Sequence, residues 1–222
     1  MVKMEPLTSS RWSRARWLVL APHPDDETLG AGALIAHSSA THRLGGIVFL
    51  TDGTGSHPEG TPRVAITRRK EARHAIGRLT ATAPCITWMG WRDAHPYRCD
   101  SLAFSRAANR LAALIRWRRI DAIAVTDHSE THCDHVVAYS LAEAALRRAH
   151  RRVTLFAYHV WSDSPARVRR IATPAMPIGQ RRHALLAHRS QMSPILGDGF
   201  RLPRRMLRMP AHDVLTLRQD RR

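Results

Sequence analysis

Two short polar clusters carry residue types that bind metals and transfer protons. The first is "HPDDE", in which His23 and Asp26 are three residues apart and Asp25 lies between them. The second is "HSETHCDH", in which His132 and His135 are also three residues apart. Imidazole and carboxylate groups bind zinc, and a catalytic zinc site keeps three protein ligands and one open position for water. The two clusters together therefore indicate a hydrolytic metal centre.

The remaining polar residues of the two clusters could also take part in hydrolysis at such a centre. A further carboxylate can take the proton of the water, and a second histidine can stabilise an oxyanion or protonate a leaving group. Each cluster alone also has a simpler explanation. Adjacent carboxylates are favourable at the start of a helix, and Asp134 with His135 can cap one. The occurrence of both clusters at strand ends favours the metal site.

Short apolar runs alternate with stretches of helical periodicity, which is typical of βαβ units and a parallel sheet. Strands are expected at residues 16–21, 45–51, 85–91, 120–126 and 153–161. Helices are expected at residues 28–37, 65–79, 101–119, 136–149 and 179–189. The predicted fold class is α/β, a Rossmann-like three-layer sandwich with a mostly parallel central sheet. Sites in such sheets form at the carboxyl ends of the strands, where both clusters lie.

The length of 222 residues suits a single domain over residues 1–222. We expect a core over about 16–191, an N-terminal tail over 1–12 and an irregular basic C-terminal segment over 192–222. No transmembrane segment is expected, and the apolar run near the N-terminus is too short for a signal peptide. The three cysteines show no paired spacing and suit reduced thiols. We therefore predict a cytoplasmic protein.

The formal net charge of +17 raises the question of an anionic partner. Of the 35 basic residues, only Lys3 and Lys70 are lysines, and the arginines are scattered along the chain. This skew is what a GC-rich genome tends to produce, so no specific nucleic-acid partner is expected. The alternative hypothesis is a protein that binds nucleic acid or an anionic surface through its arginines.

The sequences "PHPDDE" and "HCDH" together resemble the LmbE-like or PIG-L family of zinc-dependent N-deacetylases. Weaker similarity is carried by "VFLTDGTGS", "RRKEARHAIG", "WMGWRD" and "HRSQ", so that the resemblance covers roughly residues 16–191. One departure is Cys133, at a position where many members have proline. The thiol would not disturb the metal ligands, but it would add an oxidisable group near them.

The resemblance implies a role for each polar residue of the two clusters. The zinc ligands would be His23, Asp26 and His135. Asp25 would be the general base that takes the proton of the water. His132 would stabilise the oxyanion or act as an acid, and Asp134 beside it would tune an imidazole. One Zn²⁺ per chain is implied, with Fe²⁺ as an alternative ion.

The resemblance also implies a substrate class, namely an N-acetylglucosamine-containing small molecule or glycoconjugate that loses its acetyl group. Arg68 would contact the sugar or a phosphate, and Asp93 would bind a sugar hydroxyl. Family members are often homo-oligomers. A metal-dependent hydrolase of another bond, such as a phosphoester, remains an alternative, and that chemistry often uses two metals.

Overall fold

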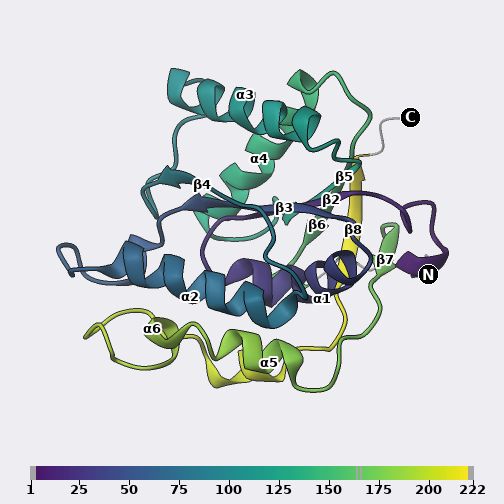
Figure 1. Ribbon diagram of the computed structural model, residues 1–222. Coiled ribbons are helices and arrows are strands. Elements are labelled where there is room, and N and C mark those ends of the chain that lie inside the picture. Colours follow the sequence, from purple (N-terminus) through teal and green to yellow (C-terminus); the bar gives the residue numbers. More distant parts are fainter. Residues whose placement is uncertain (1–3, 164, 166, 220–222) are drawn as a thin grey trace.

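The computed structural model describes residues 4–163, 165 and 167–219, and a single mixed sheet lies at its centre (Figure 1). The strands are β1 (Glu5–Pro6), β2 (Trp17–Ala21), β3 (Leu44–Thr51), β4 (Ile86–Trp91), β5 (Ala122–Thr126), β6 (Thr154–Tyr158), β7 (Arg170–Ala172) and β8 (Val214–Gln219). They are arranged in the order β1-β7-β8-β6-β5-β2-β3-β4. The pairs from β6 to β4 are parallel, whereas β8 is antiparallel to β6 and β7.

Helices cover both faces of this sheet, which confirms the predicted three-layer α/β class (Figure 1). On one face lie α1 (Asp26–Ala40) and α2 (Val64–Leu79), and α5 (Gln180–Leu185) and α6 (Arg189–Met192) pack on the outer side of these helices. The other layer holds α3 (Leu102–Trp117) and α4 (Cys133–Arg148), which pack against each other. Short 3-10 turns occur at η1 (Leu7–Ser9), η2 (Thr54–Ser56) and η3 (Arg204–Arg208). None of the described helices combines the length and apolar character needed to cross a bilayer.

Strand β2 shows how the sequence builds the two sides of the core. All five of its residues are buried. Successive side chains of a strand point to opposite faces. Accordingly, Leu18 and Leu20 join the apolar cluster under α3 and α4, while Trp17, Val19 and Ala21 join the cluster under α1 and α2. A continuous apolar run is what a central parallel strand requires.

The ends of the chain are more structured than the sequence analysis expected. In the tail predicted over residues 1–12, β1 pairs with β7, and Leu7 and Trp12 are buried. The indole Nε1 of Trp12 donates a hydrogen bond to Thr154 Oγ1 at 3.0 Å. Residues 1–3 of that tail lie outside the described residues. Two isolated apolar side chains among polar ones show no periodicity, so this segment resembled a tail.

The predicted irregular segment over 192–222 contains β8, which lies inside the sheet between β6 and β7. Residues 220–222 lie outside the described part. The helix predicted over 179–189 is instead two short helices, α5 and α6, separated at residues 186–188. Strand β7 has three residues, and β8 has apolar residues only at Val214, Leu215 and Leu217, so neither forms the continuous apolar run of the central strands.

Helix α1 begins two residues earlier than predicted and is interrupted within its second turn. Ala31 has φ −135° and ψ 17°, outside the helical range. Arg181 Nη1 donates to the carbonyl of Leu29 at 2.7 Å, and the Leu34 N–H donates to Asp213 Oδ2 at 2.7 Å. Arg181 and Asp213 also form a buried ion pair. Arg181 in α5 and Asp213 just before β8 therefore satisfy the backbone groups that the interruption leaves free.

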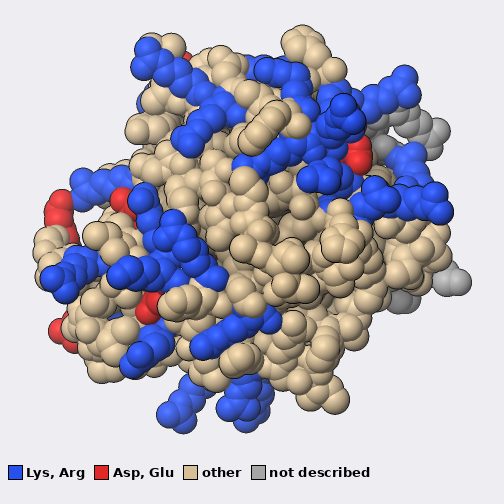
Figure 2. All heavy atoms as spheres, in the orientation of Figure 1, with Lys and Arg blue, Asp and Glu red and all other residues tan. Residues whose placement is uncertain are grey.

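The arginines are spread over the surface rather than gathered in one patch. Figure 2 shows basic side chains over both helical layers on the face in view, separated by uncharged residues. This distribution agrees with the scattered arginines of the sequence.

Candidate active site

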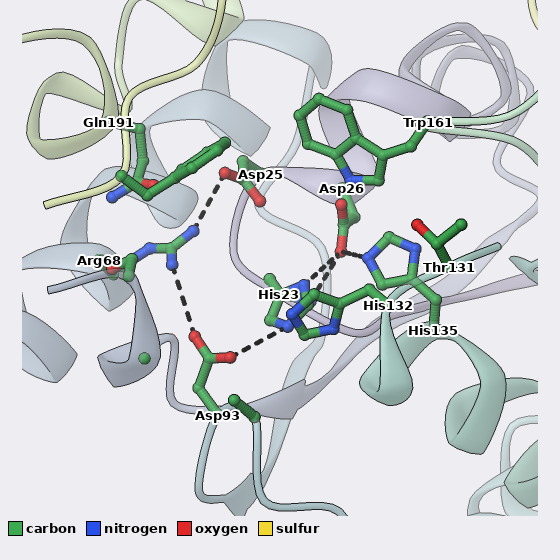
Figure 3. A pocket seen from close by; sticks show the side chains of 14 residues that line it. His23, Asp25, Asp26, Arg68, Asp93, Thr131, His132, His135, Trp161 and Gln191 are labelled. Carbon is green, nitrogen blue, oxygen red and sulfur yellow. Dashed lines mark hydrogen bonds and ion pairs between the residues drawn. The ribbon is translucent and has the colours of Figure 1, made fainter.

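The two polar clusters meet at the carboxyl edge of the sheet. Strands β2 and β5 are parallel neighbours, with Leu20 paired to Val125. The first cluster follows β2 directly, and the second lies between β5 and the start of α4. Clusters more than a hundred residues apart in sequence therefore share one pocket, as Figure 3 shows. This is the edge where the sequence analysis expected the site.

Three buried side chains form a tripod suited to a metal ion. Asp26 Oδ2 lies 3.0 Å from His23 Nδ1 and 3.3 Å from His135 Nε2. Zinc bonds of roughly 2.0–2.1 Å in tetrahedral geometry place ligand atoms roughly 3.3 Å apart. The two separations from Asp26 Oδ2 are close to that spacing. His132 lies next to the tripod, because its ligand atom and those of the other two histidines are all within 4.8 Å of one another.

The second nitrogen of each tripod histidine faces a buried carboxylate. His23 Nε2 is 3.0 Å from Asp134 Oδ2, and His135 Nδ1 is 3.4 Å from Glu130 Oε2. This carboxylate–histidine arrangement is common around protein-bound metals, where it fixes the ring orientation. Neither ring nitrogen of His135 has a hydrogen bond of good geometry within the described structure. The donor set and the unpaired buried nitrogens therefore fit a divalent cation.

The protonation of the tripod reflects the close packing of opposite charges. Burial disfavours the charged form of His135, but the Asp26 carboxylate outweighs burial and raises the pKa of His135 to about 9. Contacts with both histidines hold the pKa of Asp26 well below its usual value in spite of its burial. Without a metal, protons on the imidazoles therefore balance the buried carboxylates.

Asp25 is adjacent to the tripod but is held differently. Its φ of 157° is unusual for a residue other than glycine, and its N–H donates to Glu27 Oε2 at 2.9 Å. Its carboxylate lies 3.1 Å from Arg68 Nη2. Burial raises the pKa of Asp25 to about 6, although Arg68 opposes the shift. The turn thus separates a proton-accepting carboxylate from the neighbouring Asp26.

His132 is the N-cap of α4, and its Nδ1 accepts a hydrogen bond from the Asp134 N–H at 3.2 Å. The proton of the neutral ring is therefore on Nε2. Burial and the nearby positive histidines lower the pKa of His132, which favours this neutral form. A carboxylate oxygen of Asp134 lies within 4.8 Å of a ring nitrogen of His132, but the hydrogen bonds of that carboxylate go elsewhere. Its Oδ2 contacts His23 Nε2 and accepts from the Ala94 N–H at 2.8 Å, so His23 is the imidazole that it orients.

Comparison with known proteins identifies the family to which this chain belongs. The family model described as "PIG-L: GlcNAc-PI de-N-acetylase" matches residues 18–146, which include both polar clusters. The chain belongs to the PIG-L family. This confirms the resemblance seen in the sequence and makes the chain an N-deacetylase by family. A search of curated proteins finds no significant match.

Solved structures show the same fold. The N,N'-diacetylchitobiose deacetylase from Pyrococcus horikoshii, 22% identical, aligns with a TM-score of 0.65 over 85% of this chain and 75% of that chain. The conserved protein TT1542 from Thermus thermophilus, 27% identical, aligns with a TM-score of 0.60 over 80% of each chain. The zinc inhibited form of teicoplanin deacetylase Orf2, 17% identical, gives 0.61 over 82% of this chain and 87% of that chain.

Arg68 and Asp93 lie in the PIG-L pocket, but protein groups already contact both. Arg68 is 2% exposed and donates to the carbonyls of Gly53 and Pro24 at 3.0 and 2.8 Å, besides pairing with Asp25. Asp93 Oδ1 lies 3.2 Å from His23 Nε2. Figure 3 shows the guanidinium of Arg68 between Asp25 and Asp93. Their roles in substrate binding stay predictions.

Glu130 is a site residue that sequence reasoning missed. Its carboxylate accepts from the N–H groups of Val160, Trp161 and Ser162 at 3.0–3.2 Å. These bonds bend the chain after Tyr158, which is why β6 ends there and not at the predicted Trp161. The carboxylate also faces His135, as described above. Its position within the "HSETHCDH" cluster was the available signal.

The PIG-L pocket has a volume of about 430 Å³. Two half-exposed aromatic rings, Trp161 and Phe200, form part of its wall and meet edge to face with centroids 6.0 Å apart. Phe200 was also missed, because it lies in the segment expected to be irregular. Cys133 is exposed as a whole residue, but its thiol is partly shielded from solvent. This partial burial, with the nearby charge of Asp134, raises the pKa of the thiol, so the thiolate is disfavoured. The lining residues are His23, Asp25, Asp26, Gly55, Ser56, Arg68, Asp93, Ala94, Thr131, His132, His135, Trp161, Gln191 and Phe200.

Proposed function

We propose that this PIG-L protein binds one zinc ion through His23, Asp26 and His135 and hydrolyses the N-acetyl group of a sugar or glycoconjugate. The observation that carries the proposal is the position of Asp26 Oδ2, 3.0 Å from His23 Nδ1 and 3.3 Å from His135 Nε2, beside the separate carboxylate of Asp25, whose pKa is raised. Zinc bound there would supply acidification of water and polarisation of the acyl oxygen. Fe²⁺ is the alternative ion.

The residues of the chain divide the proton transfers between them. Asp25 accepts a proton from the attacking water, for which its pKa of about 6 is well matched near neutral pH. The Nε2–H of His132 is placed to donate to the oxygen on which negative charge develops. When the C–N bond breaks, Asp25 or His132 returns a proton to the amine. Amide and water thereby give amine and acetate.

An N-acetylated sugar is supported as substrate by the character of the pocket. Among its lining residues, Arg68 is the arginine, and its Nη1 and Nη2 groups already contact Gly53, Pro24 and Asp25. The aromatic wall offers a surface for the apolar face of a sugar or its substituent. Two of the three named structures are deacetylases, one of N,N'-diacetylchitobiose and one of teicoplanin, which agrees with this class.

Acetate release tests the proposal. The zinc-loaded protein would be incubated with a panel of N-acetylated sugars, and acetate would be measured. Zinc must be supplied at one equivalent, because a relative is known in a zinc inhibited form. Acetate from at least one compound, with one zinc per chain, supports the proposal. Metal analysis of the protein as purified and a separate assay with a phosphate ester complete the test, because two metals per chain with cleavage of the ester would instead support the alternative hydrolase.

Two further properties belong to this proposal. We propose a cytoplasmic location, since Cys85, Cys99 and Cys133 are free and exposed, as suits a reducing compartment. A homo-oligomer is proposed from the resemblance alone, and light scattering of the purified protein would test it.

A further inference from the structure

A surface groove is bordered by α5 and η3, which pack against each other at the edge of the molecule opposite α3 (Figure 1). It has a volume of about 740 Å³. Among the described residues, none lines both this groove and the catalytic pocket. The groove is therefore a feature separate from the proposed active site.

The floor of the groove is apolar and is formed by Leu186, Met192, Leu202 and Leu207. Leu202 is 6% exposed, and Met192 and Leu207 pack against the core beneath them. Leu186 is 43% exposed. Apolar surface of this kind gains free energy when an occupant removes it from water.

The rim of the groove carries four arginines, Arg182 from α5 and Arg204, Arg205 and Arg208 from η3. All four are exposed, and their guanidinium groups have no hydrogen bond or ion pair with another described residue. The described lining residues include no carboxylate. Figure 2 shows basic side chains projecting at this lower edge of the molecule. The groove thus joins an apolar floor to unpaired positive charge.

The overall composition does not account for this local excess of charge. The whole chain has 35 basic and 18 acidic residues, whereas residues 174–212 contain seven arginines and one acidic residue, Asp198. An exposed arginine elsewhere, Arg92, pairs with Glu59 at 2.6 Å. Several unpaired like charges around an apolar floor indicate a partner that supplies the carboxylates.

We propose that this groove binds an amphipathic helix of a partner protein, whose apolar face is flanked by aspartate and glutamate residues. Such a helix places apolar side chains in a groove at helical spacing, while its flanks reach the rim. Guanidinium groups pair with carboxylates through two parallel hydrogen bonds. Arginines from both bordering elements suit the two flanks of a helix. This binding does not depend on the proposed deacetylation.

The relative exposure of floor and rim favours a helix over other anionic partners. A surface that binds a bilayer inserts its apolar side chains into the lipid. In this groove the arginines are exposed, whereas most of the apolar floor is more buried. A nucleic acid would use the arginines for its phosphates and would leave the apolar floor uncovered.

Fluorescence anisotropy tests the proposal with a labelled model helix of about 18 residues, which has leucines at i, i+3, i+4 and i+7 and glutamates beside them. The double variant Arg204→Gln/Arg205→Gln should weaken binding about tenfold, because two exposed ion pairs are lost. Leu186→Ser should weaken it about fivefold, because less apolar surface is covered.

The matched controls are on α3, away from the groove. Arg106→Gln/Arg110→Gln removes two exposed arginines, and Leu102→Ser replaces a leucine that is 65% exposed. Both should bind the helix like the unmodified protein. These substitutions are at exposed positions, so folded variants are expected for both the test and the control.

Three outcomes would overturn the inference. The first is no saturable binding of the acidic helix up to about 1 mM. The second is equal binding of a helix with lysines in place of the glutamates. The third is stronger binding to phosphatidylglycerol vesicles or to duplex DNA that is lost in the arginine variant but kept in Leu186→Ser, which would replace the helix with an anionic surface.

Discussion

Asp25 and Asp26 are neighbours with opposite proton affinities. Both are buried, and burial alone raises the pKa of a carboxylate. Two histidines reverse this shift at Asp26, whereas Arg68 only partly offsets it at Asp25. Asp26 therefore stays charged, as a metal ligand must, and Asp25 can gain and lose a proton.

This difference predicts the result of replacing the base. In Asp25→Asn the tripod is untouched, so zinc content should stay at one per chain, while kcat falls about 10²–10⁴-fold because general-base catalysis is lost. Metal analysis and acetate release measure the two effects. Asp100→Asn, whose carboxylate pairs with Arg98 on the exposed surface, is the control. Near-normal turnover in Asp25→Asn would remove Asp25 from the mechanism.

The raised pKa of His135 predicts how zinc affinity depends on pH. In the metal-free protein its pKa is about 9, so below pH 9 the ring is protonated and must lose that proton to bind a metal. Affinity should therefore weaken as pH falls, about tenfold per pH unit for one displaced proton and more if His23 also releases one. Titration against a competing chelator between about pH 6 and 9 checks this. A flat profile would exclude His135 as a ligand.

Glu130 should affect the zinc affinity of the site, although it is not one of the proposed ligands. Glu130→Gln keeps the size of the side chain but removes the charge facing His135 Nδ1. Loss of such a supporting group typically weakens metal binding by about 10–100-fold. The same chelator competition measures this, with Glu59→Gln at the surface as control. Equal zinc affinities for Glu130→Gln and the unmodified protein would mean that Glu130 only shapes the segment after β6.

At the scale of the elements, the interruption of α1 depends on the pair of Arg181 and Asp213. Arg181→Met leaves a buried carboxylate without its partner, which typically costs about 3–5 kcal/mol of unfolding free energy. Adding Asp213→Asn removes that charge and should restore part of the loss. Chemical denaturation measures both variants, with the exposed neighbour Arg182→Met as control. If the single and double variants were equally stable, the ion pair would not be what holds the interruption.

The elements that could be predicted from sequence are those with a long period or a paired motif. The apolar run before His23 and the amphipathic helix around Leu111 are such patterns, and both clusters were expected at strand ends. Strand β8 could not be predicted because only three of its six residues are apolar, and Phe200 could not because a single aromatic residue in a loop carries no periodic signal. The partner that Asp134 faces depends on side-chain directions across three loops, which spacing does not encode.

At the scale of the whole molecule, the net charge of the chain differs in sign from the charged groups that line the pocket. The formal net charge is +17, yet the pocket holds carboxylates and its arginine is already paired. A neutral substrate therefore gains little from the surface field, and its kcat/KM should change less than about twofold between about 20 and 300 mM salt. Acetate release at several ionic strengths tests this. A steep fall with salt would point to an anionic substrate guided by the arginines of Figure 2.

The position of β8 late in the sequence determines when the fold can be completed during synthesis. The strand is inserted between β6 and β7, and Asp213 just before it binds the backbone of α1. A ribosome releases His23 and Asp26 long before residues 213–219. During synthesis, the proposed metal ligands at the start of α1 therefore emerge well before the segment that binds the backbone of this helix. Stalled chains ending before β8 should bind zinc weakly, even though every ligand is already present in them.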